Sequence, residues 1–362
     1  MIDRAFHAAA RILRVLTVPA LGAACGDAPK NAHTGDDSTI VDTADSAGHT
    51  ADTSAESDST ETTEDSDSAE ETAEPRCVGS GPWVYVAAGY NGSCGIHEDG
   101  CMECWPAVDT GAWTPRVNDT GYYGQTGNLV PPDGAYSAVD LGRCNEWGTH
   151  SCAIRKFDGG IECWGSDAWR AASPPSGEWT ALALIDDESC ALGVDGRIAC
   201  WGRFIGPGSA AAYSMASDYV AISECDYIVC GLAADGRADC WDGVSQDPIW
   251  TYAGPWISIE NWYLTVYGVG VDGSVYNNYG MNTLPTTDLP AVDVCLTGGR
   301  AWGCVLDVAG GVECTRGLQP VPDATFSSIA CGLVWACGIT TDGQALCWGN
   351  CDYGVCDVPI HE

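Results

Sequence analysis

Residues 230–241 read CGLAADGRADCW, and this unit recurs along the chain. It consists of a cysteine, a short strand-like run, an Asp-Gly pair, and a second cysteine followed by tryptophan. Asp-Gly between two such runs is typical of a tight β-hairpin, because glycine adopts a positive φ without steric cost. The chain contains seven copies of the unit, beginning at Cys94, Cys152, Cys190, Cys230, Tyr267, Cys304 and Cys337.

The spacing of the copies indicates the architecture. Successive copies start 58, 38, 40, 37, 37 and 33 residues apart. Three copies diverge: the second has one extra residue, the fifth has Tyr267 and Asn277 in place of the cysteines, and the sixth lacks the Asp and the Trp. A period near 40 residues is typical of a four-stranded propeller blade. The chain is therefore predicted to be all-β, with a seven-bladed β-propeller over residues 77–362.

A second repeated element keeps a fixed distance from the first. An aromatic residue, two further residues and an aliphatic residue begin eleven positions before the unit in five copies, and a longer interval separates the two elements in copy two. The pairs are Trp83/Val86, Tyr136/Val139, Trp179/Leu182, Tyr219/Ile222, Trp256/Ile259 and Phe326/Ile329. Two elements in constant register favour a true structural repeat.

The cysteine spacing predicts bridges within the hairpins. Asp99 lies midway between Cys94 and Cys104, so a three-residue loop centred on it places the two cysteines directly opposite each other. Opposed residues have Cα atoms about 4.5–5.5 Å apart, within disulfide reach. Zinc binding is disfavoured, because paired CxxC knuckles are missing and histidine is scarce. The predicted hairpin bridges are Cys94–Cys104, Cys152–Cys163, Cys190–Cys200, Cys230–Cys240, Cys304–Cys314 and Cys337–Cys347.

The other cysteines are less informative. Cys351 and Cys356 are expected to close the loop in WGNCDYGVC. Cys25 belongs to the N-terminal segment discussed below. The sequence does not pair the remaining six, which are Cys77, Cys101, Cys144, Cys225, Cys295 and Cys331.

The N-terminal quarter differs in composition from the repeats. Residues 1–25 combine a positively charged start, a short apolar run and small residues before Cys25, which is typical of a signal peptide. The string LGAAC also resembles a lipobox, whose cysteine is lipidated, although Leu21 lies one position too far from it; an ordinary signal peptide cut near Ala24 is the alternative. Residues 26–76 hold fifteen acids and no aromatic residue, and they are predicted to form a disordered linker.

Composition excludes some function classes. The formal net charge is −35, from 15 Lys+Arg and 50 Asp+Glu. Such a chain repels nucleic acid and anionic lipid. The 21 cysteines indicate an oxidising compartment. We expect an extracytoplasmic protein, either an outer-membrane or cell-surface lipoprotein that contacts the membrane only through its lipid anchor, or a secreted protein.

The repeat resembles that of the regulator-of-chromosome-condensation family. The unit itself, CWGNCDYGVC at residues 347–356 and GYYGQTG at residues 121–127 carry the resemblance, which covers roughly residues 77–362 and is closest to Cys-rich bacterial extracellular members. The resemblance implies a seven-bladed propeller. Nuclear members exchange nucleotide on a small GTPase, but this chain looks exported and its repeat region is acidic, so only the fold is carried over. Some secreted bacterial propellers of this type act as inhibitors of a secreted enzyme.

We therefore expect a monomeric, non-catalytic module that binds a protein or glycan partner and uses no cofactor or metal. No catalytic constellation is evident in the sequence, and His150 is interpreted as a structural hydrogen-bonding residue. The alternative is an extracellular hydrolase or lyase with a site on the propeller face, which paired carboxylates in a central pocket would favour. The candidate binding aromatics lie outside the repeated elements: Trp113, Tyr122, Tyr123, Trp147, Trp169 and Trp250.

Overall fold

A computed structural model describes most of the repeat region. The described residues are 79–90, 92–105, 131–142, 150–185, 188–203, 211–212, 218–225, 228–242, 247–262, 264–280, 283–297 and 302–360. Several predictions concern residues outside these ranges. They are the signal peptide (1–25), the linker (26–76), Cys25, Cys77, Cys144, Trp113, Tyr122, Tyr123 and Trp147. In the described part, no helix is long and apolar enough to cross a membrane.

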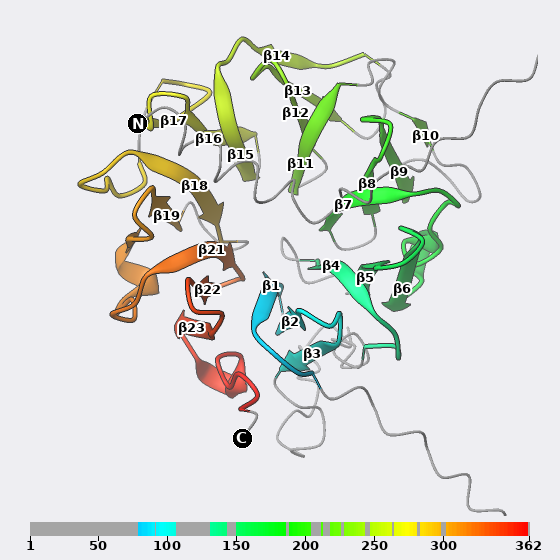
Figure 1. The fold of residues 1–362 in the computed structure, drawn as a ribbon. Coiled ribbons are helices and arrows are strands. Elements are labelled where there is room, and N and C mark those ends of the chain that lie inside the picture. Colours follow the sequence, from blue (N-terminus) through cyan, green and yellow to red (C-terminus); the bar gives the residue numbers. More distant parts are fainter. Residues whose placement is uncertain are drawn as a thin grey trace, which may run out of the picture. The chain divides into compact units, whose positions relative to one another are not determined.

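The described strands form seven antiparallel sheets arranged as the blades of a ring (Figure 1). Blades 3 and 4 have four strands, and the other five have three strands within the described residues. Blades 1 to 3 comprise β1 (Trp83–Ala88), β2 (Ser93–His97) and β3 (Met102–Trp105); β4 (Tyr136–Leu141), β5 (His150–Arg155) and β6 (Ile161–Gly165); and β7 (Trp179–Ile185), β8 (Glu188–Gly193), β9 (Ile198–Gly202) and β10 (Ala211–Ala212). Blades 4 and 5 comprise β11 (Tyr219–Cys225), β12 (Ile228–Ala233), β13 (Ala238–Asp242) and β14 (Trp250–Tyr252); and β15 (Trp256–Trp262), β16 (Thr265–Gly270) and β17 (Val275–Asn277). Blades 6 and 7 comprise β18 (Ala291–Leu296), β19 (Gly303–Asp307) and β20 (Val312–Cys314); and β21 (Phe326–Cys331), β22 (Trp335–Thr340) and β23 (Ala345–Gly349). The prediction of a seven-bladed all-β propeller is confirmed.

Each repeated unit is the second hairpin of a blade. In blade 1, the His97 N–H donates to the Cys101 carbonyl at 2.9 Å, and the Gly100 N–H donates to the His97 carbonyl at 2.8 Å. The loop is therefore the predicted three residues, 98–100. Asp99 stabilises it by accepting a hydrogen bond from the Cys101 N–H at 2.8 Å, which is the usual role of Asp in such turns.

The glycine of each unit also joins its blade to the next one. All seven glycines have φ between 65° and 98°, a region that costs other residues energy. The carbonyl of each glycine accepts a hydrogen bond, 2.8–3.2 Å long, from the first N–H of the following inner strand. These glycines are Gly100, Gly159, Gly196, Gly236, Gly273, Gly310 and Gly343. The Asp-Gly signal therefore encodes inter-blade contacts as well as turns.

The aromatic residue of the second repeated element packs across the middle strand of its own blade. A Cβ added to Gly268 would lie 2.0 Å from the Trp256 ring, and one added to Gly95 would lie 2.6 Å from the Trp83 ring. Blade 6 shows the complementary change. There Ala291 replaces the aromatic residue and Val305 replaces the glycine, so the larger side chain has moved to the other strand.

The hairpin bridges predicted from the spacing are present in the structure, as is Cys351–Cys356. The hairpin cysteines have Cα separations of 4.0–4.1 Å, below the 4.5–5.5 Å expected for opposed residues. An eighth bridge, Cys295–Cys331, joins the inner strands of blades 6 and 7. Cys101 and Cys225 are also disulfide-bonded.

Among the described strands, none is exchanged between the first and last blades where the ring closes. The Trp83 N–H donates to the Gly343 carbonyl at 2.9 Å, as at every other blade junction. The Trp335 indole N–H donates to Ser93 Oγ at 2.9 Å. Val355 is buried in the cluster that Trp83 and Trp335 share, so the segment after β23 also covers this junction.

Candidate functional site

Of the six candidate binding aromatics, the structure describes two, Trp169 and Trp250, and Trp169 is the one whose side chain is exposed to solvent. It lies in the short 3-10 helix η4 (Ala168–Arg170), between the last strand of blade 2 and the first strand of blade 3. Its side chain is 59% exposed. Trp250, by contrast, lies in β14 and is a partly buried member of the cluster between blades 4 and 5.

A buried polar network fixes the loop behind Trp169. The Ala171 carbonyl accepts hydrogen bonds from Ser189 Oγ at 2.9 Å and from the Trp201 indole N–H at 2.8 Å. His150 Nε2 lies 2.6 Å from Ser189 Oγ. Because the Ser189 hydroxyl donates its single proton to Ala171, His150 must donate from Nε2. His150 is fully buried. Its hydrogen bond to Ser189 joins blade 2 to blade 3.

The backbone at Trp169 and Arg170 is left-handed. Their φ values are 58° and 65°, and they are the two non-glycine residues with positive φ in the described part of the chain. The segment 164–171 aligns with 348–355, where Gly354 (φ 79°) stands in the position of Arg170. Left-handed non-glycine residues cost energy and persist where the surroundings enforce them, often at ligand sites.

A cation lies beside the exposed indole. The guanidinium carbon of Arg203, the residue that follows β9, is 5.6 Å from the centre of the Trp169 ring. This distance is within the range of a cation–π contact. Trp169, Arg170 and Arg203, which we call the Trp169 patch, thus bring together residues from the ends of blades 2 and 3.

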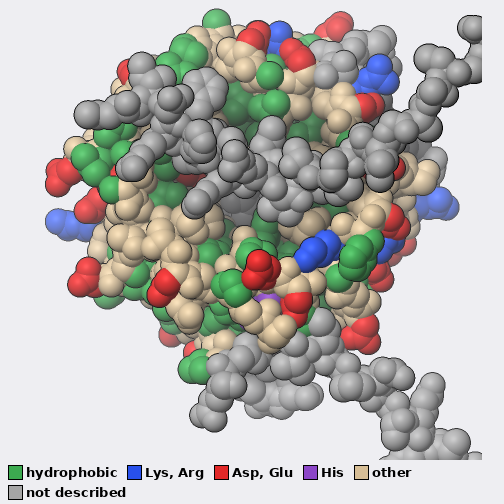
Figure 2. Space-filling model, in the orientation of Figure 1, with side chains coloured by type: hydrophobic (Ala, Val, Ile, Leu, Met, Phe, Trp, Pro, Cys, Tyr) green, Lys and Arg blue, Asp and Glu red, His purple; other side chains and the backbone are tan. Residues whose placement is uncertain are grey.

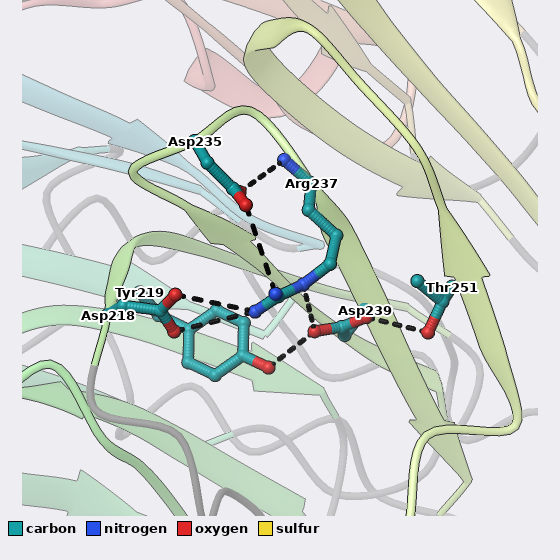
Figure 3. Close-up of polar contacts among 6 residues, drawn as sticks. All are labelled: Asp218, Tyr219, Asp235, Arg237, Asp239 and Thr251. Atoms are coloured by element: carbon teal, nitrogen blue, oxygen red, sulfur yellow. Dashed lines mark hydrogen bonds and ion pairs between the residues drawn. The ribbon is translucent and has the colours of Figure 1, made fainter.

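Arg237 organises a second polar cluster, at the Asp-Gly turn between β12 and β13 of blade 4 (Figure 3). Asp239, which is buried, accepts hydrogen bonds from Arg237 Nε at 2.8 Å and from the Tyr219 hydroxyl at 2.6 Å. Thr251 Oγ1 donates to the other oxygen of Asp239 at 2.7 Å. Burial and the bond to Asp239 raise the pKa of Tyr219 well above its usual value. Because these groups satisfy one another, the cluster is structural.

A small cavity lies at the axis of the ring. It has a volume of about 190 Å³ and is lined by the inner strands of six blades. Five of the six aliphatic residues of the second repeated element line it, together with three acids, Asp140, Glu260 and Asp293. Asp140 accepts a hydrogen bond from the Leu184 N–H of blade 3 at 2.9 Å. A typical ligand pocket is larger, about 300–1,000 Å³, so this cavity fits a few water molecules rather than a glycan.

Asp293 is the carboxyl group in the cavity whose pKa is raised. Burial raises its pKa to about 6, and the charge of Glu260 acts in the same direction. Two hydrogen bonds oppose this shift: Ser258 Oγ donates to Asp293 Oδ1 at 2.6 Å, and the Val294 N–H donates to the same oxygen at 2.9 Å. Asp293 thus ties blade 6 to blade 5.

We expect Asp293→Asn to stabilise the protein above pH 6. The pKa of Asp293 is higher in the folded state than its ordinary value of 3.8, so the folded state binds the proton more tightly. The free energy of unfolding should therefore fall as the pH rises from about 4 to about 6. An asparagine keeps the acceptor oxygen and removes the charge, and the gain should be about 1–2 kcal/mol at pH 7–8.

Denaturant unfolding of both proteins between pH 4 and pH 8 measures this effect. The difference in unfolding free energy should be close to zero at pH 4 and should grow through pH 6. A difference that stays constant across this range would show that the carboxyl group does not titrate in the cavity.

The three cysteine sulfurs of Cys295, Cys304 and Cys331 lie within 4.8 Å of one another. All three belong to disulfides, Cys295–Cys331 and Cys304–Cys314. A cystine offers no thiolate to a metal, so this grouping is two adjacent bridges.

The surface and the bridges bear on where the protein works. Figure 2 shows Asp and Glu side chains spread over the face in view, with fewer Lys and Arg. Eight disulfides join described residues. Such bridges form and persist in oxidising compartments, so the propeller belongs to an extracytoplasmic environment.

Comparison with known proteins agrees at the level of the fold. No protein-family model and no curated protein sequence matches the chain. The ectodomain of the receptor kinase CR4 from Physcomitrella patens is similar, with 18% identity, a TM-score of 0.53, and coverage of 75% of this chain and 74% of that one. The CRINKLY WD40 ectodomain of the Arabidopsis thaliana receptor kinase ACR4 gives 18% identity, a TM-score of 0.52, and coverage of 75% and 99%.

The fold and its cystines define the class: a disulfide-bonded, seven-bladed β-propeller. The repeat sequence itself resembles that of the regulator-of-chromosome-condensation propellers. Prp20p, the RCC1 of Saccharomyces cerevisiae, is among the similar structures, with 14% identity, a TM-score of 0.42, and coverage of 75% of this chain and 72% of that one. The fold assignment itself rests on the sheets and on the two ectodomains.

Proposed function

We propose that the chain is an exported, lipid-anchored cell-surface propeller that binds a protein or glycan partner and catalyses no reaction. The observation that carries this proposal is Trp169, an exposed aromatic side chain on a loop held by buried hydrogen bonds. Rigid, exposed aromatic residues are favoured binding anchors because they lose little conformational entropy on contact. Loops on a rigid scaffold are where binding residues concentrate.

The cysteine inventory supports the lipid anchor. Of the 21 cysteines, sixteen form the eight bridges, and Cys101 and Cys225 are also bonded. Because the total of 21 is odd, at least one cysteine of the chain lies outside any intramolecular disulfide. Acylation of Cys25 would account for this odd cysteine and would leave Cys77 and Cys144 to pair with Cys101 and Cys225.

An extracellular hydrolase or lyase is the competing function. Asp293 and Glu260 form the kind of carboxylate pair in a central cavity that favours it. The cavity, however, is small, and Asp293 accepts hydrogen bonds that link neighbouring blades. These contacts support a structural role for Asp293.

Intact-mass analysis of the protein from its native host tests the anchor. We expect a mature chain that begins at Cys25 with added acyl mass and takes up no alkylating reagent unless it is first reduced. Peptide mapping without reduction should then recover Cys101 and Cys225 linked to Cys77 and Cys144. A chain with an uncleaved start and several free thiols would overturn both the compartment and the anchor.

Binding to isolated cell-envelope material tests the binding role. The full chain should adsorb to that material, and Trp169→Ala should adsorb less. The absence of any saturable adsorption would contradict the binding function.

A further inference from the structure

The Trp169 patch is a single aromatic platform. Among the described residues, several other strongly exposed apolar side chains, Phe157 (88%), Val194 (60%) and Val271 (63%), lie at the Asp-Gly turns, whereas Tyr279 (62%) belongs to blade 5 and Ile360 (91%) to the segment after β23. Those turns are at the opposite ends of the strands from Trp169, which follows the last residue of β6. A protein interface of usual size needs a larger apolar core than one indole ring. The patch therefore fits a compact ring better than a protein surface.

The charge of the patch indicates the kind of ring. Arg203 and Arg170 are both exposed, and Arg203 lies 5.6 Å from the Trp169 ring. A nearby carboxylate, Asp167, accepts hydrogen bonds from the Ala172 N–H at 3.0 Å and from Ser173 Oγ at 3.1 Å. At physiological ionic strength, charges more than about 8 Å away are largely screened. An anionic group beside the indole thus lies near the guanidinium group of Arg203, and Arg170 is the residue next to Trp169 in the chain.

We propose that the Trp169 patch binds hexuronic acid residues of an acidic polysaccharide. The apolar C–H face of a pyranose ring stacks on the indole, and the sugar carboxylate pairs with the guanidinium of Arg203, with Arg170 adding a second positive charge. Guanidinium groups match carboxylates through two parallel hydrogen bonds. This inference rests on the proposed binding function and names the class of its ligand.

The backbone of the patch supports the same assignment. Two consecutive left-handed residues hold Trp169 at the surface, while Ala171 is buried behind it. Blade 7 makes the equivalent turn with Gly354 and carries no arginine there. In the loop of blade 2, two residues with a strained left-handed backbone, a tryptophan and an arginine, therefore follow each other at the surface.

Calorimetric titration of the full chain with oligogalacturonides tests the proposal. We expect saturable binding that weakens about tenfold or more in Trp169→Ala and in Arg203→Gln. Arg170→Gly should weaken it severalfold, and because glycine favours a positive φ this variant removes the charge without moving the loop. Phe157→Ala, which removes an exposed aromatic ring at the other end of the strands, should bind like the unaltered protein.

Two further probes separate stacking from charge. Neutral cello-oligosaccharides lack the carboxylate and polyglutamate lacks the sugar ring, so each should bind at least about tenfold more weakly than oligogalacturonides. Equal binding of polyglutamate, or full binding by a Trp169→Ala protein that melts normally, would overturn the inference. If the unaltered protein adsorbs to cell-envelope material but binds no oligogalacturonide, the ligand class is wrong and the binding function stands. If it does neither, both are wrong.

Discussion

Reduction of the cystines is expected to unfold the propeller at temperatures at which the oxidised protein is stable. Each hairpin bridge closes a loop of about eleven residues and contributes on the order of 2–3 kcal/mol by restricting the unfolded chain. Cys295–Cys331 spans 36 residues and should contribute about 4 kcal/mol on the same basis. Domains are usually stable by only about 5–15 kcal/mol in total, so the bridges together are comparable with the whole.

The measurement must allow for the burial of the bridges. The first cysteine of each bridged hairpin is at most 1% exposed, so reductant acts slowly on the folded protein. The protein should therefore be reduced in denaturant, alkylated and returned to buffer, with an unreduced sample taken through the same cycle. A cooperative melting transition should return only in the unreduced sample. An unchanged transition in the alkylated sample would contradict the stabilising role of the bridges.

Gly343→Ala is expected to destabilise the propeller strongly. Gly343 has a φ of 85° and lies at the junction of blades 7 and 1. An added Cβ would lie 2.3 Å from Pro82 Cβ, and the Gly343 carbonyl accepts the hydrogen bond from Trp83 that closes the ring. Left-handed strain of about 1–2 kcal/mol and a similar cost of overpacking should lower the melting temperature by on the order of 5–10 °C.

Gly280→Ala provides the matched control. Gly280 has a φ of 71°, and nothing lies within 4 Å of the Cβ that alanine would add. This variant therefore isolates the backbone cost, about 1 kcal/mol. Differential scanning calorimetry of both variants should show the larger loss for Gly343→Ala. Equal losses would mean that the junction adjusts to the extra methyl group.

The fold was predictable from sequence because its signals are local. A ten-residue spacing of cysteines around Asp-Gly specifies one hairpin, and seven hairpins at a near-constant interval specify the ring. The bridge between Cys295 and Cys331 was not predictable, because it depends on where the inner strands of blades 6 and 7 end in space. The inner strand of blade 6 was also missed, since Ala291 removes the aromatic signal and the compensating change, Val305 in place of glycine, lies on the neighbouring strand.

The candidate site was predictable only in part. Trp169 stood out because it lies outside both repeated elements, but the same criterion selected Trp250, which packs against a core cluster. The contribution of Arg203 was missed, because it comes from the next blade and about 30 residues further along the chain. One signal was available: aligning 164–171 with 348–355 puts Arg170 where the other turn has glycine, which points to an enforced left-handed backbone.

The glycine-carbonyl hydrogen bond that all seven blade junctions share has a consequence for the order of the chain. Each blade is built from consecutive strands, and the contact between blades 7 and 1 uses the same glycine-carbonyl hydrogen bond as the other six. The connectivity of the described strands therefore does not require any particular blade to come first in the chain. Circular permutants opened between other blades should reach the same native structure, and gain or loss of a whole blade would keep this hydrogen bond at each remaining junction.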